Sequence, residues 1–216
     1  MLVKICGITR LEDARFAVEC GARALGFVFW PESPRSIDPD HARAIVSTLP
    51  PFVTPVGVFV NQASEYVNGV VALARLGAVQ LHGDETAAYA GAITRPVIKA
   101  VGVAGTDEEI DGWPPGTLLL LDVYDPVRRG GTGRTLDWAR ASAIAARRRV
   151  VLAGGLTPDN VAEAISRVQP FGIDVSSGVE VAPGVKDHQR LARLFEVVRA
   201  VAEKADSPQG TRWTRS

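Results

Sequence analysis

Cysteine is scarce in this chain, with 2 among 216 residues, which is too few for a disulfide scaffold. The two can pair only with each other. The segment Leu11–Cys20 is predicted to be a helix, with acidic residues in its first turn and Gly21 after its end. At a rise of about 1.5 Å per residue, that helix carries Cys20 more than about 10 Å from Cys6, whereas a bridge needs Cα atoms within about 7 Å. We therefore expect Cys6 to be a free thiol and Cys20 to be a packing residue.

The chain also lacks net charge, because 24 Lys and Arg balance 24 Asp and Glu. A balanced chain has no global field that would attract nucleic acid or an anionic membrane. The run Arg147–Arg149 is expected to be a solvated loop. No apolar stretch approaches the about 20 residues of a membrane span, and the first predicted strand leaves no room for a signal peptide. We expect a cytoplasmic protein without nucleic-acid or membrane partners.

Several catalytic signatures are absent as well. The sequence contains no zinc-ligand spacing, no Walker-type loop and no recognisable Ser/His/Asp arrangement. No Gly-x-Gly-x-x-Gly follows the first strand, which disfavours an open doubly wound sheet, the second-best fold prediction. The chemistry considered below requires no metal and no organic cofactor, so we expect neither.

A repeated unit is what the chain does contain: a short apolar strand, a loop and an amphipathic helix. Several strands are continuous apolar runs, such as Leu118–Leu121, and such runs are typical of strands covered on both faces. Eight strands alternating with helices over about 200 residues are the pattern of an α/β protein of the (β/α)8 TIM-barrel type. We expect one barrel domain over residues 1–203 and a mobile tail over residues 204–216.

The element boundaries follow from the apolar runs and the turn residues between them. The first strand begins at Leu2 and stops before Gly7, and the last helix follows an N-cap at Asp187 and ends near Val201. The other predicted strands are Ala24–Phe29, Pro55–Val60, Ala78–Leu81, Val97–Val101, Leu118–Asp122, Val150–Ala153 and Gly172–Val175; the other predicted helices are Leu11–Cys20, Pro39–Leu49, Ser64–Leu76, Glu85–Ala92, Thr106–Ile110, Leu136–Ala146 and Pro158–Val168.

The first strand has an unusual inner face. Alternation places Val3 and Ile5 on one face and Lys4 and Cys6 on the other. Cys6 is compatible with a small buried hydrophobe and with a reactive group. Asp174 lies on the strand that becomes a neighbour when the barrel closes, so we expect an internal ion pair between Lys4 and Asp174.

Active sites of such barrels lie at the C-terminal ends of the strands, and three further side chains are candidates there. Asp122 ends an all-leucine run and is either a general acid kept protonated by burial or a partner of Lys99 or of a helix end. Arg35 is either a clamp for a carboxylate or a solvated loop charge. His82 is as compatible with a supporting role as with a catalytic one.

A phosphate site is predicted from the last two strand ends. Gly154 and Gly155 follow the seventh strand, and Ser176, Ser177 and Gly178 follow the eighth. Glycines let backbone N–H groups approach an anion closely, and hydroxyl groups satisfy its oxygens. Barrels often bind phosphate with these two loops. Plain turns are the alternative.

With these residues collected, the chain resembles the phosphoribosylanthranilate isomerase family of tryptophan biosynthesis from Lys4 to about Arg199. It departs from the family at Leu136, where Phe is more common before Asp-Trp. The motifs that carry the resemblance are Lys4–Thr9, Gly26–Phe29, Pro34-Arg35, Gly57–Asn61, Gln80–Gly83, Gly130–Gly133, Asp137-Trp138, Gly154–Leu156 and Asp174–Glu180.

The resemblance implies an Amadori rearrangement of N-(5-phosphoribosyl)anthranilate to 1-(2-carboxyphenylamino)-1-deoxyribulose 5-phosphate. It implies that Asp122 is the general acid that opens the ribose ring, that Cys6 is the general base that removes the C2′ proton, and that Arg35 lies near the anthranilate carboxylate. The partner is then a small phosphosugar, and the enzyme is a monomer or a homodimer. Because the base must be a thiolate, we expect Lys4 to lower the pKa of Cys6.

Two other functions remain open from the sequence. One is a different phosphate-binding barrel isomerase, such as the related enzyme of histidine biosynthesis, which uses aspartates where this chain has Cys6. The other is a binder of phosphosugars without catalysis. The presence of both Cys6 and Asp122 argues against it.

Overall fold

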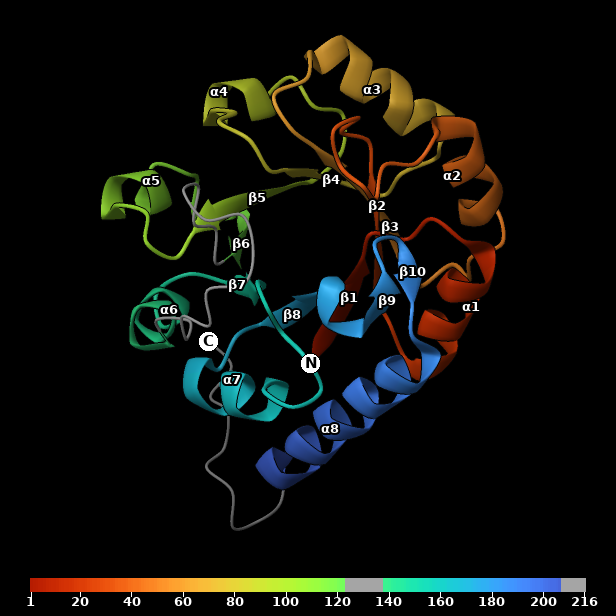
Figure 1. Cartoon of the computed structure of the whole chain (residues 1–216). Helices are drawn as coiled ribbons and strands as arrows, with labels where there is room; N and C mark the ends of the chain where they lie inside the picture. The colour runs from red at the N-terminus through yellow and green to blue at the C-terminus, as the bar shows by residue number, and fades with distance from the viewer. Residues whose placement is uncertain (123–137, 207–216) are drawn as a thin grey trace.

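The computed structural model describes residues 1–122 and 138–206. Its core is a closed barrel of eight parallel strands, in which each strand pairs with the next and the last pairs with the first. Helices surround the strands as an outer ring (Figure 1). The TIM-barrel prediction is therefore confirmed. No helix in the described ranges is both long and apolar enough to cross a membrane.

The elements alternate along the chain as the sequence predicts. The barrel strands are β1 Leu2–Cys6, β2 Ala24–Val28, β3 Thr54–Phe59, β4 Ala78–Leu81, β5 Val97–Gly102, β6 Leu118–Asp122, β7 Val150–Leu152 and β8 Gly172–Val175. The helices are α1 Leu11–Cys20, α2 Pro39–Val46, α3 Ser64–Leu73, α4 Ala87–Ala90, α5 Asp107–Asp111, α6 Trp138–Ala145, α7 Val161–Val168 and α8 His188–Asp206.

Every helix except α1 differs from its predicted bounds, and α2 and α3 each end three residues earlier than predicted. α4 does not include Glu85, whose side chain is buried in a network described below, and Thr86 caps the helix by accepting the Tyr89 N–H. α7 begins three residues later than predicted, because Asn160 closes a turn before it. α8 continues to Asp206, five residues past its predicted end. The rest of the expected tail, residues 207–216, lies outside the described residues.

A small hairpin after β8 is absent from the predicted elements. The short 3₁₀ helix η1 (Ser177–Val179) leads into β9 (Glu180–Ala182), and an antiparallel β10 (Val185–Lys186) returns to α8. Its strands have three and two residues, too short to show a periodic pattern. The pairing brings Lys186 opposite Glu180.

The alternation along β1 is as predicted. Val3 and Ile5 pack outward with the main core under the helices, while Cys6 packs inside the barrel with residues of β2 and β3. Gly26 of β2 pairs with Cys6, and a Cβ at that glycine would lie 2.7 Å from Cys6 Sγ. Gly26 therefore provides the space that the thiol occupies. Cys6 and Cys20 are both free, as expected.

The run Arg147–Arg149 lies in a loop with Arg147 and Arg149 exposed, as expected, but Arg147 and Arg148 also make contacts across the fold. Arg147 binds Asp107 at 2.6 Å and Asp111 at 2.7 Å. Arg148 donates to three backbone carbonyls at and after the end of α5, at distances of 3.0 to 3.1 Å. Arginine has enough donors to satisfy several acceptors at once, so this run holds α5 against α6 and β7.

Candidate active site

The predicted site residues come together at the C-terminal end of the barrel. Cys6 ends β1, Asp122 ends β6 and His82 follows β4. Arg35 lies in the loop after β2, and Gly155 in the loop after β7. The residues after Asp122, which include the motif Gly130–Gly133, lie outside the described residues.

Cys6 lies in a buried, charged environment. Lys4 Nζ and Asp174 Oδ2 form the predicted ion pair at 2.8 Å, with side chains only 3% and 8% exposed. Lys4 and Asp174 come from β1 and β8, which pair in the closed barrel. Although burial alone would lower the pKa of Lys4, Asp174 and Cys6 outweigh it and raise that pKa, so the lysine stays charged.

Lys4 favours a lower pKa for Cys6, as expected, but the net shift of the Cys6 pKa is upward. Burial raises the pKa of the Cys6 thiol, and Lys4 opposes this shift without overcoming it. Asp174 adds to the increase because its negative charge disfavours a second anion beside it. The free protein therefore holds Cys6 as a thiol at neutral pH.

Asp122 is less enclosed than the sequence suggests. Its side chain is 26% exposed, and His82 Nε2 lies 3.4 Å from its Oδ2. Gln80 Nε2 lies 2.8 Å from His82 Nδ1. With Gln80 as the donor, His82 carries its proton on Nε2, toward Asp122. This position is compatible with a supporting role, and the choice between the two predicted roles of His82 stays a prediction.

The alternative partner for Asp122 is engaged elsewhere. Lys99 Nζ lies 3.0 Å from Glu85 Oε2 and donates to the Gly83 carbonyl. Glu85 also accepts the N–H groups of Asn61 and Gly83, at 2.7 and 2.9 Å. This network holds the loop after β4, which carries His82, against the ends of β3 and β5.

Arg35 is not a solvated loop charge. Its Nε lies 3.0 and 3.1 Å from the two carboxylate oxygens of Glu180, and its Nη2 lies 2.7 Å from Glu180 Oε2. Ser33 accepts the Arg35 backbone N–H at 3.1 Å. Sequence reasoning quotes Glu180 in a motif but assigns it no role, because the partners are 145 residues apart.

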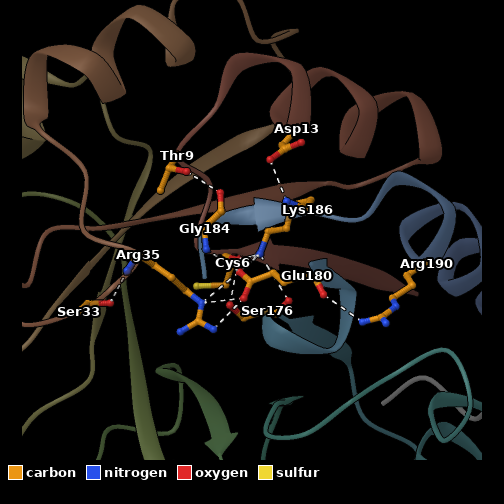
Figure 2. A network of polar contacts seen from close by, with 10 residues as sticks. All are labelled: Cys6, Thr9, Asp13, Ser33, Arg35, Ser176, Glu180, Gly184, Lys186 and Arg190. Atoms are coloured by element: carbon orange, nitrogen blue, oxygen red, sulfur yellow. Dashed lines mark hydrogen bonds and ion pairs between the residues drawn. The ribbon is translucent and has the colours of Figure 1, made fainter. Parts of the chain in front are cut away.

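Lys186 completes the polar network around β1 (Figure 2). Its Nζ lies 2.7 Å from Glu180 Oε1 and 2.5 Å from the Cys6 carbonyl oxygen, and its side chain is fully buried. The Ser176 hydroxyl donates to the same carbonyl at 3.1 Å. Ser176 therefore joins β8 to the end of β1. Sequence reasoning missed Lys186 together with its hairpin.

The two predicted phosphate loops lie against each other. Gly154 and Gly155 have φ values of 89° and 62°, in the region that favours glycine. Asn160 holds this loop by donating to the Gly155 carbonyl at 2.9 Å. A Cβ at Gly178 would lie 1.9 Å from the Leu156 carbonyl oxygen, so only glycine permits this contact between the loops.

The site contains no obvious metal position. Within residues 1–122 and 138–206, no three histidine, cysteine or acidic side chains gather as metal ligands would. The expectation that the chain needs no cofactor stays a prediction.

Comparisons with known proteins assign the family. The model of the N-(5'-phosphoribosyl)anthranilate isomerase family matches residues 3–197. The N-(5'-phosphoribosyl)anthranilate isomerase of Trichlorobacter lovleyi is 55% identical, with 89% of this chain and 95% of the relative covered. The crystal structure of the Thermotoga maritima phosphoribosyl anthranilate isomerase is 46% identical, with a TM-score of 0.87 over 93% of this chain and 99% of the other.

A further solved relative carries a ligand. It is a phosphoribosyl anthranilate isomerase in complex with reduced 1-(o-carboxyphenylamino)-1-deoxyribulose 5-phosphate, 44% identical, with a TM-score of 0.83 over 93% of this chain and 99% of the other. The likeness extends over nearly the whole described barrel and agrees with the resemblance found from the motifs. The chain belongs to the N-(5'-phosphoribosyl)anthranilate isomerase family.

Proposed function

We propose that Asp122 is the general acid and Cys6 the general base of this chain's reaction. The chain catalyses the isomerisation of N-(5'-phosphoribosyl)anthranilate in tryptophan biosynthesis. Asp122 gives its proton to the ribose ring oxygen, and the C1′–O bond breaks to leave a protonated Schiff base. Cys6 then removes the C2′ proton, and the enolamine tautomerises to the ketone.

The location of Cys6 is the observation that carries the proposal. A packing cysteine needs no charged neighbours, yet Lys4 binds Asp174 beside this thiol and Lys186 binds its carbonyl. Burial disfavours the thiolate, and nearby positive charge favours it. The cationic Schiff base formed in the first step adds positive charge where the thiolate is needed. Cys6 therefore becomes a thiolate, and able to accept a proton, only after Asp122 has protonated the substrate and the ribose ring has opened.

Arg35 and the two loops bind the ends of the substrate in this proposal. Arg35 binds the anthranilate carboxylate, while Gly154, Gly155, Ser177 and Gly178 surround the phosphate group with backbone N–H groups. Ser176 contributes indirectly, because its hydroxyl already donates to Cys6.

The acid–base assignment is tested by following the loss of phosphoribosylanthranilate fluorescence with purified protein. We expect Cys6→Ala to lower kcat by at least about 10², a size typical of general acid–base groups. Cys20→Ala is the matched control, because that cysteine lies on α1 and packs outside the barrel. Circular dichroism shows whether both variants fold. A folded Cys6→Ala variant with near wild-type kcat would refute the role of Cys6.

The phosphate site has a separate test. Inorganic phosphate should compete with substrate, and Gly155→Asp should raise KM because it adds a negative charge to an anion site. A Cβ at Gly155 meets no atom within 4 Å, so Gly155→Ala isolates the cost of the positive φ. If the Asp and Ala variants have equal KM values, the phosphate binds elsewhere.

The cellular setting belongs to the same proposal. We expect the enzyme to act in the cytoplasm on a small phosphosugar, as a monomer or a homodimer. A solved Thermotoga maritima relative is described as monomers generated from a dimeric phosphoribosylanthranilate isomerase. Light scattering of the purified chain distinguishes the two states.

A further inference from the structure

Glu180 occupies one edge of the Arg35 guanidinium. An arginine has five N–H donors, one on Nε and two on each Nη atom. Nε and Nη2 face the Glu180 carboxylate at 2.7 to 3.1 Å. No described residue accepts a hydrogen bond from Nη1. The edge formed by Nη1 and the remaining N–H of Nη2 is therefore open, and it has the width of a carboxylate.

The contacts around Glu180 fix this geometry. The Glu180 side chain is 4% exposed, whereas that of Arg35 is 23% exposed, so solvent reaches Arg35 and hardly reaches its partner. Both Arg35 and Lys186 point toward Glu180 (Figure 2). A Cβ at Gly7, which has φ +75°, would lie 2.6 Å from Arg35 Cδ. Gly7 therefore lets the arginine pass over the end of β1.

The charges of the three groups also matter. Arg35 and Glu180 alone would form a neutral pair with little attraction for another anion. Burial disfavours the ionised form of Glu180, but hydrogen bonds from Arg35 and Lys186 outweigh it and lower its pKa. Burial lowers the pKa of Lys186, and Glu180 opposes this shift; in its protonated form Lys186 places a second positive charge 2.7 Å from the carboxylate, and the cluster then carries one net positive charge.

We propose that Glu180 is a positioning residue that presents the open edge of Arg35 to the anthranilate carboxylate, and that Lys186 keeps the pair attractive to that anion. The proposal rests on the carboxylate role of Arg35 in the proposed function. It deepens that function by separating orientation, which depends on Glu180, from charge, which depends on Lys186.

The test compares two ligands with each variant. One is reduced 1-(2-carboxyphenylamino)-1-deoxyribulose 5-phosphate, and the other is the same compound with a phenylamino group and no carboxylate. The ratio of their Kd values, from calorimetry, measures what the carboxylate contributes. In the wild type we expect a ratio of about 10 to 100, the size of a hydrogen-bonded contact between charged groups.

The variants separate geometry from charge. Glu180→Gln raises the net charge of the cluster, so a purely electrostatic cluster would bind the carboxylate more tightly. If Glu180 positions Arg35, the ratio should instead fall toward one. Lys186→Met should also lower the ratio, through lost charge. In both variants, binding of the ligand without the carboxylate should change less than about threefold, because that ligand does not use the fork.

Matched controls keep the test decisive. Glu163→Gln removes an exposed Glu–Arg pair on α7 and should leave the ratio unchanged. If Glu180→Gln fails to fold, Glu180→Asp keeps the charge with a shorter reach, and the ratio should again fall. The positioning role alone would be overturned by the following results together. A folded Glu180 variant keeps the wild-type ratio of Kd values, Arg35→Ala lowers that ratio, and the wild-type chain is an active isomerase. If Arg35→Ala also leaves the ratio unchanged, Arg35 does not bind the anthranilate carboxylate, and the proposed function loses that contact as well.

Discussion

The two sides of the barrel mouth hold their reactive groups differently. On the β1–β8 side, Cys6 is enclosed by the pair Lys4–Asp174, and Lys186 binds its carbonyl. On the β4–β6 side, Asp122 has a 26% exposed side chain, and His82 Nε2 lies 3.4 Å from its Oδ2. In the proposed mechanism, Cys6 needs charged neighbours because burial disfavours its thiolate form, whereas the proposed acid Asp122 is accessible to solvent.

Each side nevertheless contains a buried lysine–carboxylate pair. Lys4 and Asp174 lie inside the barrel next to the thiol, while Lys99 and Glu85 hold the loop after β4. The first pair thus acts on the electrostatics of the reacting group, and the second acts on the position of a loop. The predictions below exploit this contrast.

The largest effect is expected when the β1–β8 pair is broken. Asp174→Ala leaves Lys4 charged and buried without a partner, which costs about 3–5 kcal/mol in the free energy of unfolding. Urea denaturation measures this loss. Asp159→Ala is the control: it breaks an exposed pair with Arg193 and should cost no more than about 1 kcal/mol. Equal costs for the two variants would mean that the buried pair does not stabilise the barrel.

Substitution of the proposed acid on the β4–β6 side should lower kcat and leave the stability of the fold nearly unchanged. Asp122→Asn removes the proton donor, so we expect kcat to fall by at least about 10². Because the side chain is partly exposed and its contact with His82 is long, at 3.4 Å, the melting temperature should stay within a few degrees of the wild type. Combined with Cys6→Ala, the loss should be smaller than the product of the single losses, since both groups serve one reaction sequence. Fully multiplicative losses would argue for independent roles.

The space around the thiol provides a sharper test. A Cβ at Gly26 would lie 2.7 Å from Cys6 Sγ and 3.1 Å from Cys6 Cα, so Gly26→Ala should cost about 1–3 kcal/mol through overpacking and should also reduce kcat. Gly69→Ala is the matched control on α3, where an added Cβ meets nothing within 4 Å; there the helix should gain up to about 1 kcal/mol. Thermal unfolding should show a lower melting temperature for Gly26→Ala and an equal or higher one for Gly69→Ala.

The smallest effect is expected in the pH dependence of the free energy of unfolding. Because burial raises the pKa of Cys6 above its ordinary value of about 8.5, the unfolded chain loses this proton at lower pH than the folded chain. The Cys6 contribution to stability should therefore be complete below about pH 8.5 and decline above it. In a Cys20→Ser background, thiolate absorbance should reach its midpoint above about 8.5; a midpoint below that value would contradict the raised pKa.

The sequence was sufficient for those features that depend on local periodicity or on barrel closure. Alternation put Lys4 and Cys6 on the inner face, and closure brought Asp174 to Lys4, as the structure confirms. The net direction of the Cys6 pKa shift was not predicted, because it depends on the balance between burial and two opposite neighbouring charges. That balance is a property of the packed barrel and not of any segment.

The sequence did not predict features that depend on very short elements or on residues far apart in the chain. The β9–β10 hairpin has too few residues for a periodic signal, so neither Lys186 nor the role of Glu180 was found. The contacts of Arg147 with the Asp107 and Asp111 carboxylates and of Arg148 with three backbone carbonyls join residues more than 30 positions apart, which composition does not reveal. The phosphate loops were foreseen as positions, but the glycine contact between them depends on the tertiary structure.

The pairing of β1 with β8 determines when the surroundings of Cys6 can form during translation. Cys6 is translated 180 positions before Lys186, which binds its carbonyl. Asp174 and Glu180, the partners of Lys4 and Arg35, are likewise translated late. A nascent chain that ends before β8 therefore contains Cys6, the proposed base, but not Asp174 or Lys186. In the proposed mechanism, the charged surroundings of Cys6 are complete only once the chain through Lys186 has been made.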